Sequence, residues 1–583
     1  MIRSWPTKRN EVFAVAAVAI WLAIVGFEIW SRASSATEPP VWDALSYARK
    51  SQAFWAAIDS GMKFNPFGLD PTTRPPGTVL ISYPFGFSEQ YAGFYFRTNF
   101  IPAILLALSV LIVGSALPEQ RRSPLLIGGM AICLAGIPPI FQFQFFGDIP
   151  SAGYWGLVDN FITGVAALAA ACLVAASLRR FWGWAGVAAC LSALCLWFKP
   201  AGLLIMGCML FSFGCIAWRE IARDRKLDSW IVRSLVLFLV AYLVAGSAAF
   251  FSPYFSHANI EFGSRVMEVA RAESHWSFDF QTIGERLHVG TGWGVVTLVV
   301  FGLLLAAMER KYRWTVPASL LALAFGGWLW LFGVGDIGQV RYFLPFALVA
   351  AIFLLPAVIE WMSGRGAVIQ GVVVSILALP ALASTVLAAI HRGGPSYQRL
   401  LGINLTSSAY PAEGRLGSSV LDDAESRGIR RPRIYVCSLS TPLRNFGAVI
   451  DYGLAIGTRD TKGTIVIPVD WTRGFAFRFD EILTADYLAC DRTAAVGRPV
   501  GTCESDEVYI GECANRPTGA AEPVGKQGMV ASFDDEYVVV RDWLQTLGSD
   551  SGVEAVSTDR MLLLQIVDKR RFEMALADFA SRY

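Results

Sequence analysis

Residues Leu157 to Leu178 read LVDNFITGVAALAAACLVAASL, and this stretch decides what kind of fold the chain can adopt. Asp159 is its only charged side chain. A run of roughly 18 or more apolar residues is long enough to cross the hydrocarbon core of a membrane as a helix. The stretch therefore predicts a transmembrane helix with a carboxylate at its amino-terminal end.

Stretches of the same kind fill the chain as far as residue 390 and make eleven predicted spans in all. Of the 583 residues, 54% are hydrophobic and 16% charged, a composition too apolar for an ordinary soluble enzyme. The net charge of +2 and the lack of a Lys/Arg-rich run exclude a nucleic-acid partner. The other spans are Val12–Trp30, Phe94–Leu117, Leu125–Phe146, Trp182–Phe198, Ala201–Trp218, Leu235–Tyr254, Gly292–Met308, Trp314–Phe332, Leu344–Met362 and Val368–Ile390.

Cations in the short connections predict how the chain is oriented in the membrane. They precede span one and follow spans two, four, six, eight and ten. This alternation places the amino terminus in the cytoplasm and the carboxyl-terminal region outside a bacterial-type inner membrane. A cleaved signal peptide, with Arg3 to Arg9 as its charged region, is the alternative for the first span. The apolar run is longer than the 7 to 15 residues that such a signal has, which favours a retained span.

After Ile390 the composition becomes charged and polar, and His391-Arg392-Gly-Gly-Pro395 marks a boundary. We predict a transmembrane domain over residues 1–391 and a soluble extracytoplasmic α/β domain over residues 396–583. Helical patterns cover Val420 to Gly428 and Arg570 to Phe579. Strands are predicted at Arg433–Cys437, Thr464–Pro468, Tyr487–Cys490, Tyr537–Val540 and Met561–Gln565.

The ten cysteines divide between the two predicted domains. Six lie in spans, where a small apolar side chain is the ordinary interpretation. The other four, Cys437, Cys490, Cys503 and Cys513, all fall in the terminal domain and allow three pairings. We favour Cys503 with Cys513 and Cys437 with Cys490. A zinc site is the rival, although no CxxC pair or nearby histidine accompanies them.

The connection from Val41 to Pro84 combines a carboxylate, aromatic residues, cations and a double proline. Asp43 lies just beyond the first span, where an acid is also a common helix N-cap. The turn Arg74-Pro-Pro-Gly77 cannot continue a helix and fixes where Arg74 points. The second outer connection adds Asp148 and Asp159, each of which interfacial capping could explain alone.

Cations from different spans fall on the same predicted outer face. Charges at membrane depth are expensive unless they are paired or serve a site, so each is a functional candidate. Snorkelling to the headgroups is the alternative, above all for Arg97. Cations that converge on an outward-facing site suit the phosphate of an anionic lipid. These candidates are Arg74, Arg97, Lys199 and Arg341.

Five short motifs carry a resemblance to a known family, which extends over roughly the first 390 residues. The chain resembles the GT-C glycosyltransferases, multispan enzymes that use polyprenyl-phosphate sugars. They include protein O-mannosyltransferases and lipid A aminoarabinose transferases. The order of the motifs along the chain is that of the family. The motifs are Trp42-Asp43-Ala-Leu-Ser-Tyr47, Arg74-Pro-Pro-Gly77, Leu157-Val-Asp159, Phe198-Lys199-Pro200 and Arg341-Tyr-Phe-Leu-Pro345.

The resemblance implies a polytopic α-helical GT-C-like membrane fold with about eleven transmembrane helices. It implies transfer of a hexose or pentose from a polyprenyl-phosphate donor to a lipid, glycan or protein acceptor, with inversion at the anomeric carbon. Asp43 matches the family's first-loop acid, the general base on the acceptor nucleophile. The cations would stabilise charge on the leaving lipid phosphate. The implied substrate-binding residues are Tyr47, Arg74, Lys199, Arg341 and Tyr342.

The sequence departs from the family at one position. Relatives commonly carry an acid before the loop cation that helps hold a divalent ion, whereas this chain has Thr73. Asp148 or Asp159 could still ligate Mg²⁺ or Mn²⁺ through oxygen. A further outer connection, Ser256 to Gly290, contains three of the four histidines without metal-ligand spacing. It is interpreted as a loop that folds over the donor or as interfacial packing.

Two other classes of function compete with sugar transfer. A transporter or flippase for lipid-linked saccharides is expected to show paired repeats of broken helices, which the sequence lacks. A polymerase or ligase that moves whole oligosaccharides would use the same kind of donor, and the sequence separates it poorly from a monosaccharide transferase.

Overall fold

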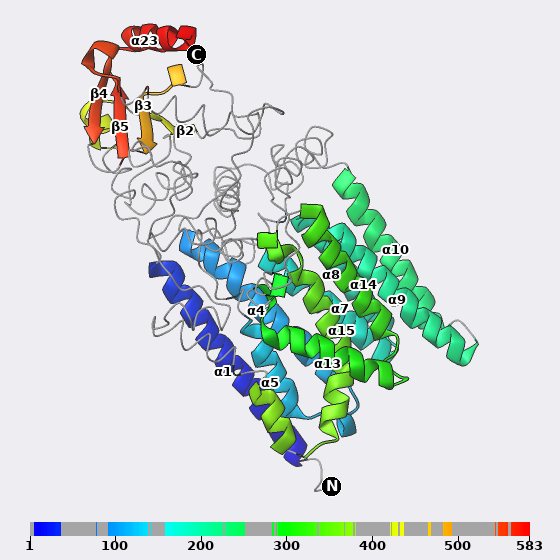
Figure 1. Cartoon of the computed structure of the whole chain (residues 1–583). Helices are drawn as coiled ribbons and strands as arrows, with labels where there is room; N and C mark the ends of the chain where they lie inside the picture. Colours follow the sequence, from blue (N-terminus) through cyan, green and yellow to red (C-terminus); the bar gives the residue numbers. More distant parts are fainter. Residues whose placement is uncertain are drawn as a thin grey trace, which may run out of the picture. The chain divides into compact units, whose positions relative to one another are not determined.

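A computed structural model gives the fold of the chain (Figure 1). The chain divides into two compact units, one with the helices up to α15 and one with the β-sheet and α23. The predicted boundary near His391 lies outside the described residues. The structure describes residues 5–35, 77, 91–137, 140, 158–225, 228–250, 283–284, 287, 290–334, 337–366, 368–376, 379, 420, 422–429, 432–436, 465–467, 482–491, 543, 546–557 and 561–582.

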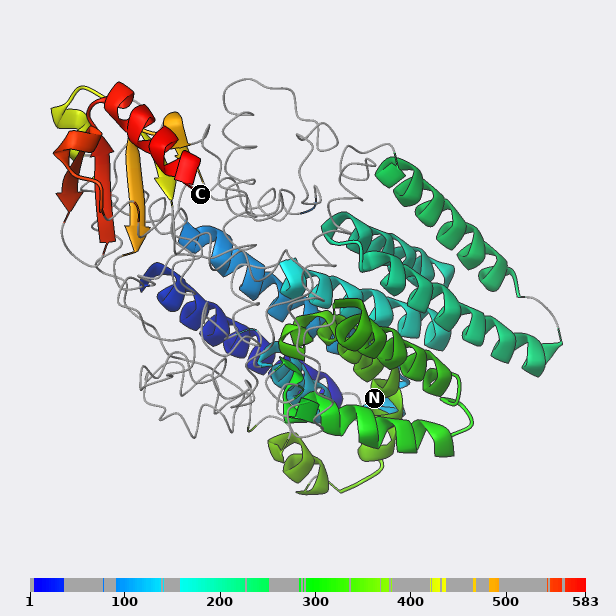
Figure 2. The same ribbon diagram turned by 45° about the horizontal axis from the view of Figure 1, so that its top comes forward.

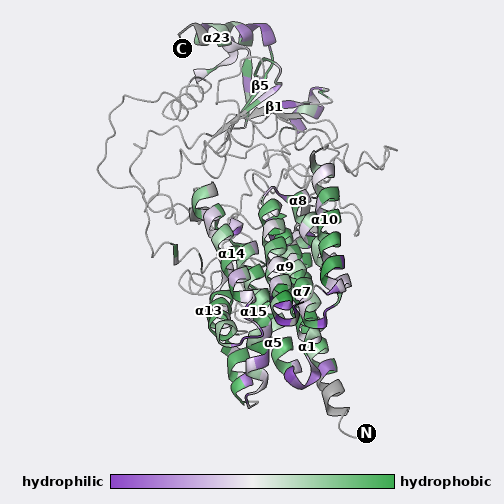
Figure 3. Ribbon diagram, turned by 90° about the vertical axis from the view of Figure 1, so that its right-hand side faces the viewer, coloured by the Kyte–Doolittle hydropathy of each residue, from purple (hydrophilic) through white to green (hydrophobic). Residues whose placement is uncertain are grey.

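Apolar helices make up the first unit, and Figure 3 shows hydrophobic residues over most of their lengths. In the part of the chain that the structure describes, seven helices are long and apolar enough to cross a membrane. Each of the first ten predicted spans overlaps a helix, and residues 368–376 of the eleventh are helical. The helices are α1 Trp5–Ser35, α4 Tyr91–Ala116, α5 Pro124–Ala135, α7 Val158–Arg179, α8 Trp182–Phe198, α9 Gly202–Asp224, α10 Ser229–Phe250, α13 Trp293–Met308, α14 Thr315–Trp328 and α15 Leu344–Ser363.

Helices α7 and α15 form the centre of this unit. Their apolar windows are 83% and 89% buried, whereas that of α10 is 22% buried. Helix α15 packs against α13, α14 and α7, and α7 packs in turn against α4 and α8. Small side chains permit this closeness, which matters because lipid tails give apolar helices no hydrophobic reason to associate. A Cβ on Gly164 of α7 would lie 3.0 Å from the Cα of Pro102 in α4.

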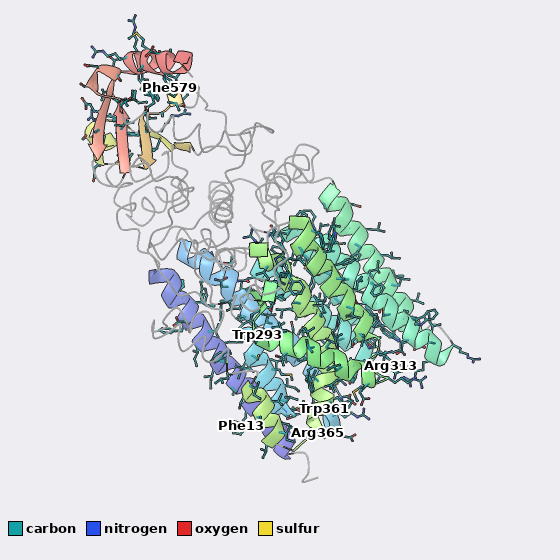
Figure 4. All side chains as sticks on the ribbon, viewed as in Figure 1. Phe13, Trp293, Arg313, Trp361, Arg365 and Phe579 are labelled. Carbon is teal, nitrogen blue, oxygen red and sulfur yellow. The ribbon has the colours of Figure 1, made fainter. Side chains whose placement is uncertain are left out.

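Glu360, near the end of α15, collects hydrogen bonds from two other connections at the same end of the bundle. Lys311 Nζ donates to its Oε2 over 2.9 Å, and Tyr312 and Arg121 also donate to it. Burial and the hydrogen bond to Glu360 raise the pKa of Tyr312. One turn further along the chain, Arg365 lies over the ring of Trp361, with Cζ 4.3 Å from the centroid (Figure 4).

Glu220 of α9 likewise binds cations, and one of them comes from the connection between α7 and α8. It is buried and accepts hydrogen bonds from Arg180 and Arg219. Arg219 also donates to Ser177 Oγ over 3.1 Å and to the carbonyl of Lys311 over 3.3 Å. These contacts gather the cations that follow predicted spans two, four, six and eight at one end. Which side of the membrane that end faces stays a prediction.

The second unit contains a five-stranded sheet of order β2-β1-β3-β5-β4. Strands β2, β1 and β3 are parallel neighbours, and β5 is antiparallel to β3 and β4. Helix α23 (Lys569–Arg582) lies along the sheet (Figure 2), and its Phe572 and Leu576 pack with Leu488 and Leu564. The strands are β1 Arg433–Val436, β2 Ile465–Ile467, β3 Tyr487–Asp491, β4 Val553–Ser557 and β5 Met561–Ile566.

Four of the five predicted strands match this sheet, and the fifth, Tyr537–Val540, lies outside the described residues. Strand β4 was not predicted, because Val-Glu-Ala-Val-Ser is short and only partly apolar. It forms as an edge strand because its partner β5 supplies the hydrogen bonds. The cysteine pairings and the position of this unit outside the membrane stay predictions.

The close crossing of α7 and α4 predicts a large difference between two glycine substitutions. Gly164→Leu forces a side chain against Pro102 and Leu105 and should destabilise the protein by about 1–3 kcal/mol. Gly214→Leu in α9 meets open space and should leave stability nearly unchanged. Thermal unfolding of the detergent-purified proteins measures both, and equal melting temperatures for the two variants would contradict the packing described.

Candidate functional site

A buried ion pair joins the first turn of α7 to the end of α8. Lys199 Nζ lies 2.5 Å from Asp159 Oδ1. Asp159 is the second residue of α7, where free backbone N–H groups and the helix dipole favour an anion. Lys199 follows the last residue of α8, where the dipole favours a cation. Each charge therefore stands at the helix end that stabilises it, and the two ends lie side by side.

Both members of this pair are almost removed from solvent. The side chain of Lys199 is 10% exposed and that of Asp159 is 3% exposed. Asp159 Oδ2 is buried and has no hydrogen-bond partner within the described part of the chain. A buried pair of this kind stabilises little overall, but removing one member leaves a charge that costs about 3–5 kcal/mol.

The ring of Tyr342 receives two cations. Lys199 Nζ lies 4.4 Å from the ring centroid and Arg341 Cζ lies 5.3 Å from it. Cations over an aromatic face are attracted by its quadrupole, most strongly where water is excluded. Tyr342 thus brings two positive charges close together, one of which also pairs with Asp159.

The local structure before α15 positions this ring. Arg341 and Tyr342 end a 3-10 helix, Ile337–Tyr342, directly before α15 begins at Leu344. The next residue, Phe343, packs against the buried Trp330, with ring centroids 5.6 Å apart. Trp330 lies in a π-helical segment, Leu329–Val334, that continues α14. The segments next to α14 and α15 therefore fix the position of the Tyr342 ring.

Two glycines allow other segments to approach the cluster. A Cβ on Gly77, the last residue of the Arg-Pro-Pro-Gly turn, would lie 2.5 Å from the carbonyl oxygen of Trp197. Trp197 precedes Lys199 by two residues, so Gly77 touches α8 where the ion pair forms. A Cβ on Gly290 would lie 2.3 Å from Val340 Cγ1, beside Arg341. Only glycine fits either contact without a shift of its neighbour.

Polar side chains of α4 reach the same end of the bundle. Asn160 Nδ2 donates a hydrogen bond to Asn99 Oδ1 over 3.0 Å, and both residues are fully buried. Arg97, two positions before Asn99, is also buried, with 7% of its surface exposed. Because Asn160 follows Asp159 in α7, this amide pair fixes α4 beside the ion pair.

The structure brings together four of the predicted site residues. Lys199 contacts both Asp159 and Tyr342, and Arg341 contacts Tyr342. Their predicted roles stay predictions. Among the other candidates, Asp43, Tyr47, Arg74, Asp148 and the outer-loop histidines lie outside the described residues.

The metal hypothesis stays a prediction as well. Asp159 uses one carboxylate oxygen on an ammonium group, so only Oδ2 is left for another partner. No group of three or more His, Cys, Asp or Glu side chains with metal-binding geometry occurs in the described ranges. Asp148, the second proposed ligand, is not among those residues.

Sequence reasoning missed two features of this site. It assigned Asp159 to a metal and Lys199 to a phosphate, and so did not predict that the two side chains pair. It also passed over Asn99 and Asn160, which form the amide pair. The sequence could have predicted this pair, because two carboxamide side chains within apolar helices must find hydrogen-bond partners.

The fold is that of a polytopic membrane protein of the GT-C type, as the sequence resemblance implies. Among solved structures the chain is similar to ArnT from Cupriavidus metallidurans bound to undecaprenyl phosphate. The TM-score is 0.50 with 14% identity, over 95% of this chain and 98% of that chain. A sequence identity of 14% supports similarity of the fold alone.

A second similar structure is the apo oligosaccharyltransferase of Archaeoglobus fulgidus. Its TM-score is 0.49 with 13% identity, over 82% of this chain and 69% of that chain. No protein-family model and no curated protein sequence matches the chain.

The buried pair predicts a rescue by double substitution. Lys199→Met leaves the Asp159 carboxylate buried beside an apolar side chain and should destabilise the protein by about 3–5 kcal/mol. The double variant Lys199→Met/Asp159→Asn removes both charges and should recover most of that loss. Melting temperatures of the single and double variants test this coupling, and strictly additive losses would show that the side chains do not interact.

Proposed function

We propose that this protein is an integral-membrane glycosyltransferase that moves a sugar from a polyprenyl-phosphate donor to a cell-envelope acceptor. The observation that carries the proposal is the convergence of Lys199 and Arg341 on one aromatic ring at one end of the bundle. Two cations that meet at one aromatic ring suit the phosphate of a lipid carrier. The similarity to ArnT, whose structure holds undecaprenyl phosphate, supports the same ligand class.

The proposed chemistry is a direct displacement at the anomeric carbon. Asp43 would take the proton from the acceptor hydroxyl or amine as the bond to the sugar forms. The bond between the anomeric carbon and the phosphate oxygen would break with inversion, and Lys199, Arg341 and Arg74 would stabilise the departing lipid phosphate. Gly77 supports a place for Arg74 in this site, because it packs at the end of α8 only three positions further along the chain.

Several parts of the proposal concern residues or groups beyond the described cluster. Tyr47 would contribute to substrate binding, and Asp148 with Asp159 Oδ2 would be the ligands if Mg²⁺ or Mn²⁺ takes part. The acceptor would be a lipid, a glycan or a protein at the outer face. A hexose and a pentose are both compatible with the proposal.

Asp43→Asn should abolish transfer, because an amide cannot accept the proton at neutral pH. We expect a loss of at least about a hundredfold in turnover. The assay is transfer of radiolabel from a polyprenyl-phosphate sugar to envelope acceptor by the purified full-length protein. Asp59→Asn, in the same connection, is the matched control and should keep activity.

The same variant separates the proposal from its rivals. A flippase would translocate the labelled lipid equally well with Asp43→Asn, and that result would overturn the glycosyltransferase proposal. An oligosaccharide ligase or polymerase would lose activity with this substitution but would transfer a preassembled glycan in preference to a single sugar.

Tyr342 is expected to govern donor affinity through its ring. Tyr342→Leu removes the aromatic face shared by Lys199 and Arg341 and should raise the donor KM by about 3- to 30-fold. Tyr342→Phe keeps the face and should restore a KM near that of the wild type. A Phe variant as defective as the Leu variant would show instead that the hydroxyl is what matters.

A further inference from the structure

A second candidate site lies at the opposite end of the bundle from the ion pair. A cavity of about 410 Å³ opens where α4 ends, α7 ends and α8 begins. This is the end at which the contacts of Glu220 and Glu360 gather the cations. The cavity is lined by Ser115, Ala116, Ala175, Arg179, Phe181 and Trp184.

Two adjacent arginines at this cavity have different roles. Arg180 adopts a left-handed backbone conformation, with φ of 50°, and its side chain turns to the buried Glu220. Its charge is therefore neutralised within the protein. Arg179 turns the other way and donates one hydrogen bond, of 2.5 Å, to the backbone carbonyl of Ser115. That bond fixes the guanidinium at the cavity wall and uses one of its five N–H donors, and no carboxylate among the described residues pairs with it.

Apolar side chains continue from the cavity along the surfaces of the two flanking helices. On α4, Leu108 lies two helical turns before Ser115 and is 41% exposed. On α8, Val187 lies one turn after Trp184 and is 45% exposed. Between the two helices, α7 presents the small Ala175. A basic group at the mouth therefore stands above an exposed apolar side chain on each flanking helix, in a bundle whose surface meets lipid.

We propose that this cavity binds the headgroup of an anionic phospholipid. The phosphate would accept hydrogen bonds from the remaining donors of Arg179, a charge-assisted and often bidentate contact. The acyl chains would lie along α4 and α8, over Leu108 and Val187. Phe181 and Trp184 would flank the glycerol region, where aromatic side chains favour the membrane interface. The occupant is a structural lipid of the bilayer, distinct from the donor proposed for the other end.

Native mass spectrometry of the full-length protein in a neutral detergent tests the assignment. Phosphatidylglycerol and phosphatidylcholine with identical acyl chains are titrated separately. The wild type should bind phosphatidylglycerol in preference, and Arg179→Gln should weaken that binding by about tenfold, as expected for one lost charged contact. Equal binding of the two lipids by the wild type would overturn the proposal.

A second variant blocks the cavity without changing charge. Ser115 is exposed and lines the cavity, while Arg179 holds only its backbone carbonyl, so Ser115→Phe should fill the space and keep the fold. It should weaken phosphatidylglycerol binding as Arg179→Gln does, at an unchanged melting temperature. Wild-type binding by both variants would place the lipid elsewhere.

Arg313 supplies the matched control. It is an exposed arginine at the same end of the bundle (Figure 4), and its Nε donates to the carbonyl of Ala307 over 3.2 Å, yet it does not line this cavity. Arg313→Gln should bind phosphatidylglycerol as the wild type does. An equal loss in this variant would show a general effect of charge, and displacement of the lipid by inorganic phosphate would show a site for free anions. Either outcome refutes a phospholipid site.

Discussion

The ion pair between Lys199 and Asp159 is the constraint on which the arrangement of this site depends. Neither charge can stay buried among apolar helices alone, so the start of α7 and the end of α8 must remain in register. That register places Lys199 over Tyr342 and Tyr342 beside Arg341. One electrostatic requirement thus couples helices α7 and α8 to the segment that begins α15.

The two ends of the bundle treat their charges differently. At one end, Glu360 pairs with Arg121 and Lys311 and Glu220 pairs with Arg180 and Arg219, and these contacts tie the connections between helices together. At the other end, Lys199 pairs with Asp159 and shares the ring of Tyr342 with Arg341. The first arrangement ties helix connections together, whereas the second brings cations from two different helices to one ring. This contrast supports placing the proposed chemistry at the Lys199 end.

Close helix packing makes this contrast possible. Gly164 lets α7 approach α4, and the lack of a side chain at Gly77 lets its backbone approach the end of α8. In lipid, such contacts replace the hydrophobic driving force that a soluble protein would use. The same small side chains of α7 leave room near Ala175, where α4 and α8 separate enough for the cavity beside Arg179. The small residues of α7 thus allow close contact with α4 at Gly164 and leave space for the cavity at Ala175.

The sequence by itself predicted where the helices lie and the strands of the second unit other than β4, and it named Lys199, Asp159, Arg341 and Tyr342 as site candidates. Apolar runs and rare charges at membrane depth are local signals, because lipid imposes the same requirement on every residue that enters it. Only the tertiary structure decided which of these residues meet. Pairing depends on helix register and rotation, which are set by packing between segments far apart in the chain. The sequence therefore proposed Asp159 as a metal ligand, and only the tertiary structure showed that the end of α8 places an ammonium group 2.5 Å from one of its oxygens.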